Sequence, residues 1–77
     1  MNGKVGWRVL AKLVGLPPGE PLTLKLRTTT PLALEQIAEL TAWDGRLLYD
    51  SGIVAIVSVP PVRVDEIAGW ETVLEIV

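Results

Sequence analysis

The sequence predicts an α+β domain built around an antiparallel sheet, and three observations favour this class. Residues 45–77 form two strand-like runs around a short turn, followed by a helical segment and a final apolar strand. An alternating run at 22–28 and an amphipathic helical pattern precede them. Strands and helices in this mixed order are typical of α+β folds. A length of 77 residues suits one domain, which we assign to residues 1–77.

The N-terminal run from Val5 to Val14 fits two templates. Read as a strand, it places alternate apolar residues on one face; read as a helix, it carries a cation at every fourth position. We favour the strand because Gly6 disfavours a helix and turn residues follow at 15–21. The run would then add an N-terminal strand to the sheet and bury Trp7 among core residues.

The next two elements carry clearer signals. From Leu22 to Thr28, leucines alternate with threonine and cations, which predicts a half-buried strand. Thr30 supplies a helix N-cap and Pro31 the first helical position, so we expect a helix from Pro31 to about Trp43. Gly45 then ends this helix as its left-handed cap.

The second half of the chain completes a recognisable order. Arg46 to Asp50 is predicted to be a strand, and Ile53 to Val59 is apolar at nearly every position, as in a central strand covered on both sides. A short helix at 62–68 and a last strand at 72–77 follow. From Leu22 onward this order predicts a ferredoxin-like split β-α-β sandwich, an antiparallel sheet with two helices on one face.

The N-terminal run is the part that this fold does not accommodate directly. In a ferredoxin-like sheet the first strand is central, so the run at 5–14 cannot form a simple hairpin with the strand at 22–28. It would pair at an outer edge, exchange with a second copy, or belong to a different five-stranded sheet. A β-grasp fold, in which a hairpin precedes the helix, is the main alternative.

Two pieces of the chain, GRLLYDSGIVAIVSVPP and VDEIAGWETVLEI, resemble the propeptides of subtilisin-type serine proteases and the inhibitors related to them. The resemblance begins at Leu22 and rests on a glycine after the first helix, an apolar strand ending near proline, and a short helix before the final strand. The positions that match are Gly45, Tyr49, Gly52, Val59, Pro60, Val64, Glu66, Ile67, Val73 and Glu75.

The resemblance implies a ferredoxin-like fold and a function in protein binding. Domains of that family lay the outer face of their sheet on surface helices of the protease, and the chain after the last strand enters the substrate cleft. Here Val77 stands at the end of the last strand, so we expect no tail for that cleft. We therefore expect a small non-catalytic protein-binding module that is propeptide-like or inhibitor-like. The alternative is a homo-oligomeric structural or assembly protein, such as one associated with a phage or a capsid.

Composition excludes several other classes. Histidine and cysteine are absent, which removes the usual general base, the thiolate nucleophile and most transition-metal ligands, so we expect no enzyme activity, cofactor or metal. A net charge of −2 disfavours nucleic acid as a partner. The longest uncharged run, 51–62, is too short to span a bilayer, and no signal peptide is evident. We accordingly expect no membrane partner and a cytoplasmic location by default.

The expected partner is a protein or a second copy of the chain. Hydrophobic residues make up 49% of the sequence. A domain this small cannot bury all of them in its own core, so we expect a partner or a second copy to cover the rest. Five of the seven basic residues precede residue 28 and eight of the nine acidic ones follow residue 34. The candidate contact residues are the cations expected on one outer face, two tryptophans and the final valine: Trp7, Arg8, Lys12, Lys25, Arg27, Trp70 and Val77.

Overall fold

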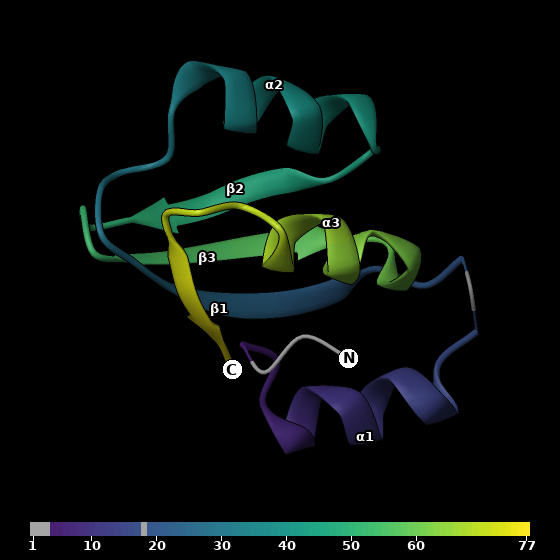
Figure 1. Cartoon of the computed structure of the whole chain (residues 1–77). Helices are drawn as coiled ribbons and strands as arrows, with labels where there is room; N and C mark the ends of the chain where they lie inside the picture. The colour runs from purple at the N-terminus through teal and green to yellow at the C-terminus, as the bar shows by residue number, and fades with distance from the viewer. Residues whose placement is uncertain (1–3, 18) are drawn as a thin grey trace.

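The computed structural model describes residues 4–17 and 19–77, and these form a four-stranded antiparallel sheet with three α-helices and one 3-10 helix (Figure 1). Residues 1–3 and residue 18, part of the predicted turn, lie outside the described residues. The α+β class is therefore confirmed. The elements in chain order are α1 (Trp7–Gly15), β1 (Leu22–Thr28), α2 (Leu34–Ala42), β2 (Arg46–Asp50), β3 (Val54–Val59), η1 (Pro61–Arg63), α3 (Val64–Ala68) and β4 (Val73–Ile76).

The strands lie in the order β2-β3-β1-β4, and all neighbours are antiparallel. The central pair joins β1 to β3, with Leu22 opposite Val59 at one end and Arg27 opposite Val54 at the other. β4 pairs with the other side of β1. Because β1 is bonded along both edges, no further strand can pair with it.

Helices cover one face of this sheet. Figure 1 shows α2 and α1 at opposite ends of the sheet, with α3 in front of β3 between them. In β1 every second side chain is buried, and in β3 Ala55, Val57 and Val59 are buried while the residues between them are half-buried. The prediction that this strand is covered on both sides is therefore wrong, because the helices all lie against the same face.

The N-terminal run forms a helix, so the prediction of an extra N-terminal strand is wrong. Gly6 is the N-cap of α1 in extended conformation, so it lies before the helix and does not weaken its interior. Of the predicted strand, Val5 and Gly6 precede the helix: Val5 forms a parallel bridge with Ile76 at the outer edge of β4, and Gly6 N donates to Ile76 O at 2.9 Å. The hairpin with β1 that the β-grasp alternative requires is not formed.

The helix α2 begins at Leu34, three residues later than predicted from Pro31. The preceding segment is held away from helical geometry by Leu32 N, which donates to Asp50 Oδ2 at 3.2 Å in the β2–β3 hairpin. The helix start is satisfied by Gln36, whose Oε1 accepts from Ala33 N at 2.8 Å. The contact between Leu32 and Asp50 thus moves the start of α2 from Pro31, which the Thr30-Pro31 pair indicated, to Leu34.

The core lies between the sheet and the helix layer. Each helix contributes to it: α1 through Val9, α2 through Leu40, and α3 through Val64, Ile67 and Ala68. Two contacts outside the core fix α2 beside the end of α3. Gln36 Nε2 donates to Thr72 Oγ1 at 3.2 Å, and the rings of Trp43 and Trp70 stack with centroids 6.0 Å apart.

Candidate functional site

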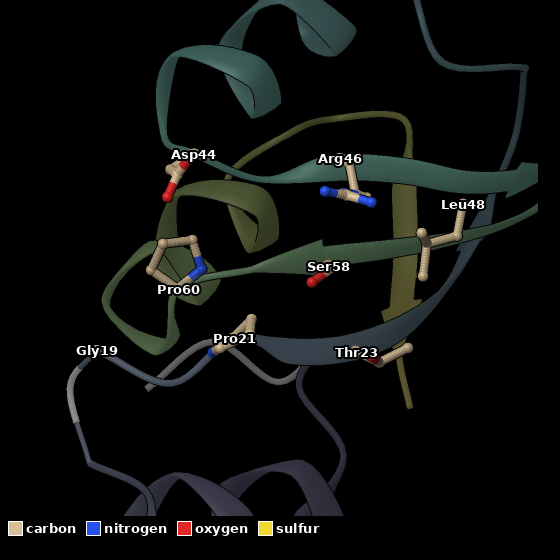
Figure 2. A pocket seen from close by; sticks show the side chains of 8 residues that line it. All are labelled: Gly19, Pro21, Thr23, Asp44, Arg46, Leu48, Ser58 and Pro60. Atoms are coloured by element: carbon tan, nitrogen blue, oxygen red, sulfur yellow. The ribbon is translucent and has the colours of Figure 1, made fainter.

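No described helix covers the face of the sheet opposite α1, α2 and α3, and this face forms the main candidate surface (Figure 2). The register of β1 and β3 places Thr23 beside Ser58, Lys25 beside Ile56 and Arg27 beside Val54 on this face. Figure 2 views part of it, with no helix in front of β2, β3 and β1. We call it the open sheet face, comprising Thr23, Lys25, Arg27, Arg46, Leu48, Tyr49, Val54, Ile56, Ser58 and Glu75.

The open sheet face combines exposed apolar groups with cations. Leu48 and Tyr49 are 50% and 55% exposed. They lie at an irregularity in the β2–β3 register, where Tyr49 stands opposite Ile56 and Leu48 is the extra residue. Such a bulge places two residues of one strand against one of its neighbour and re-aims their side chains. Leu48, Tyr49 and Ile56 therefore form an apolar strip beside the β2 edge of the sheet.

The cations of this face are largely unneutralised. Arg27 Nε lies 3.8 Å from Glu75 Oε1, and both side chains are about half exposed or more, so the pair contributes ~1 kcal/mol or less. The other ion pair among the described residues joins Arg63 to Glu66 in the helix layer. Lys25 and Arg46 belong to neither pair, so their charges remain available to a partner.

A hollow of about 410 Å³ opens on this face (Figure 2). Arg46, Leu48 and Ser58 contribute to it from β2 and β3, and the loop before β1 closes one end. Asp44 and Arg46 are its charged groups, so it is polar at the rim and apolar at Leu48. The residues that line it are Gly19, Pro21, Thr23, Asp44, Arg46, Leu48, Ser58 and Pro60.

Trp7 lies on a second, smaller surface, and the prediction that it is buried is wrong. Its side chain is 73% exposed, because on a helix Val9 rather than Trp7 faces the core. The Arg8 guanidinium lies 5.4 Å from the Trp7 ring centroid, a cation–π distance. Trp7, Arg8 and Val77 line one hollow of about 240 Å³, so three of the predicted contact residues do meet.

The remaining predicted contact residues are divided between elements. Lys25 and Arg27 lie on the open sheet face, whereas Arg8 and Lys12 lie on α1 and do not share that face as the strand interpretation required. Trp70 is half-buried against Trp43 in the helix layer. Sequence reasoning missed the β2 side of the surface. Alternation within the predicted strand 46–50 would have put Arg46 and Leu48 on one face of the strand, and the pairing of β2 with β3 makes it the face that bears Lys25 and Arg27.

Acidic residues gather on the other side of the molecule. α2 exposes Glu35 and Glu39, α3 exposes Asp65 and Glu66, and Glu71 follows in the loop before β4. We call these five residues, with the surface of α2 and α3 that bears them, the acidic helix layer. The helices and the open sheet face lie on opposite sides of the sheet, so these five carboxylates lie opposite Lys25, Arg27 and Arg46, while the cations Arg8 and Lys12 lie on α1.

The described carboxylates and the described helices set two further limits. No group of three or more carboxylates among them comes close enough to hold a metal ion. None of the helices in the described part of the chain is long and apolar enough to cross a membrane. The chain matches no protein-family model, no curated protein and no solved structure.

Proposed function

We propose that this chain is a non-catalytic protein-binding module of ferredoxin-like fold that contacts its partner through the open sheet face. The order of elements from β1 to β4 supports the fold, as does the strand order β2-β3-β1-β4, in which β1 and β3 are central. The observation that carries the function is an uncovered sheet face bearing both exposed apolar side chains and unneutralised cations.

The chemistry of the open sheet face supports a macromolecular partner. Exposed apolar groups that are contiguous and rimmed by polar residues mark interaction sites more often than accidental exposure. Tyrosine and arginine, both present here as Tyr49 and Arg46, are enriched in the centres of protein interfaces. The hollow beside Leu48 offers a place for a protruding side chain of the partner.

The resemblance of β2, β3 and α3 to the propeptides of subtilisin-type proteases supports a class of partner. Those domains use the uncovered face of their sheet against the protease. We therefore propose a subtilisin-type protease as the binding partner, with the open sheet face as the contact surface.

A titration of the purified chain against a subtilisin-type protease tests this proposal. We expect binding at micromolar concentration or below, measured by calorimetry, with hydrolysis of a chromogenic peptide followed in parallel. Leu48→Asp on the open sheet face is expected to weaken binding at least about tenfold, a loss of roughly 1.4 kcal/mol. Val14→Asp, at a residue 90% exposed on α1, is the matched control and should bind normally. Absence of binding at micromolar concentration would refute the protease as partner.

A second candidate function is homo-oligomeric assembly, and the separation of charge across the fold favours it. A molecule with a cationic face and an acidic face is complementary to another copy of itself. Size-exclusion chromatography with light scattering distinguishes the two functions. A module that binds only a foreign partner should elute as a monomer, whereas an assembly protein should elute as a defined oligomer.

A further inference from the structure

We infer that the open sheet face of one molecule binds the acidic helix layer of a second molecule of the same chain, head to tail. This inference rests on the proposed function in one respect, the open sheet face as the binding surface, and it develops the second candidate function, homo-oligomeric assembly. It goes further by naming the complementary surface, which lies on this chain itself.

Charge complementarity is the first argument. The open sheet face carries three cations, Lys25, Arg27 and Arg46, against two carboxylates, Glu75 and, at the rim of the hollow, Asp44. The acidic helix layer carries five carboxylates and one cation, Arg63, which is already paired with Glu66. Docking the two surfaces neutralises charge on both sides, and it costs little structural change because all five carboxylates are exposed.

Apolar complementarity is the second argument. The helix side exposes Leu34, 85% exposed on α2, and Val62, 67% exposed on η1. The open sheet face offers Leu48 and Tyr49 as matching apolar groups. Both surfaces thus provide apolar side chains among charges, and burying them adds a hydrophobic gain to the electrostatic attraction.

The arrangement of the two surfaces determines the kind of assembly. They lie on opposite sides of one molecule, so each copy offers one of each, and the contact is heterologous. Pairing of two open sheet faces would set cations against cations. Pairing along the free edge of β2 is opposed by the irregularity between Leu47 and Tyr49, since bulges at an edge strand disrupt further pairing.

The size of the molecule is compatible with such a contact. Its two longest dimensions are 31 and 24 Å, so a broad face approaches the about 800 Å² per partner of a standard interface. A contact of this size that depends on exposed charges should weaken as salt screens them. We therefore expect association at low ionic strength that diminishes at high ionic strength.

Two double variants test the inference by sedimentation velocity. The sheet-face variant is Lys25→Gln with Arg46→Gln, and the helix-layer variant is Glu35→Gln with Glu39→Gln. Neutral replacements are chosen because charge reversal on both surfaces would create a new complementary pair. All four positions are exposed, so both variants are expected to keep the wild-type melting temperature.

The head-to-tail arrangement predicts how a mixture of the two double variants behaves. Wild type should associate at low salt, and each variant alone should associate at least about tenfold more weakly. An equimolar mixture should recover one-to-one dimers and nothing larger, because each variant retains one intact surface. A monomeric wild type at low salt, or wild-type association in the helix-layer variant, would overturn the inference.

The same variants separate this inference from the proposed function. The helix-layer variant keeps the open sheet face, so it should still bind the protease if the proposed function is correct. If the wild type is monomeric while the helix-layer variant binds the protease and the sheet-face variant does not, the head-to-tail inference fails and the proposed function stands. If the mixture forms dimers and neither variant binds the protease, the inference stands and the protease is excluded.

Discussion

Gly45 sets how closely α2 approaches the sheet. Its amide donates to Leu40 O at 2.7 Å, and a Cβ at this position would lie 2.5 Å from Ser58 O. The left-handed conformation predicted for Gly45 is taken by Asp44 instead, at φ 62°. The Asp-Gly pair marks the end of a helix in the sequence, but the tertiary contact with β3 decides which of the two residues adopts positive φ.

Gly45→Ala is expected to destabilise the fold by about 1–3 kcal/mol, because backbone must move to admit the methyl group. For a domain of this size that loss lowers Tm by about 4–8 °C per kcal/mol. Gly15→Ala is the matched control: a Cβ there meets nothing within 4 Å, and alanine favours the helix. Thermal unfolding followed by circular dichroism measures both. Equal Tm values for the two variants would contradict the close approach at Gly45.

Side-chain burial could be predicted where apolar and polar residues alternate in a pattern that fits a strand and not a helix. In β1 the alternation of Leu22, Leu24 and Leu26 with polar residues predicted the observed burial from Leu22 to Arg27, whereas Thr28 is polar and buried. Trp7 was not predictable in this way, because its apolar neighbours fit both a strand and a helix. A strand would place Trp7 in the core, whereas the observed helix places it at the surface.

Among the elements, α1 shows the limit of local pattern. Gly6 was taken as a helix breaker within the run but serves as the N-cap, and the extended part of the predicted strand shrinks to Val5 and Gly6. The topology contained the information that the pattern lacked, since the central position of β1 left no edge for another strand. The helix instead packs Val9 into the core and exposes Trp7.

Val9→Ala is expected to cost about 1–3 kcal/mol, because it removes buried methyl groups and leaves a cavity. Trp7→Ala should change stability by less than about 0.5 kcal/mol, since the side chain is largely exposed. Urea unfolding monitored by circular dichroism gives both values. If Trp7→Ala proved the more destabilising variant, the strand interpretation of this segment would be restored.

At the scale of the whole molecule, the sequence indicated the separation of charge but not its geometry. Basic residues concentrate before residue 28 and acidic ones after residue 34, but only Lys25 and Arg27 of the early cations lie on the open sheet face, whereas Arg8 and Lys12 lie on α1. Arg46 departs from the pattern, because β2 returns it to the face occupied by Lys25. Placing it required the pairing of β2 with β3, which follows from the hairpin and not from composition.

The molecule as a whole therefore offers two surfaces with different roles. We propose the open sheet face as the partner-binding surface and the acidic helix layer as the complementary surface on another copy. Both are formed by exposed or half-buried residues that lie mainly on helices and strands, so we expect neither to require rearrangement before binding. The hollow at Trp7 lies apart from both, on α1 beside Val77, and supplies an internal reference for any mapping experiment.

Methyl NMR of the chain while partner is added, as more of the chain itself or as the protease, tests the binding surface most directly. We expect the signals of Leu48, Val54 and Ile56 on the open sheet face to shift, while those of the buried Leu24 and Val57 stay in place. Shifts confined to the methyl groups of α1, with the open sheet face unchanged, would contradict the account.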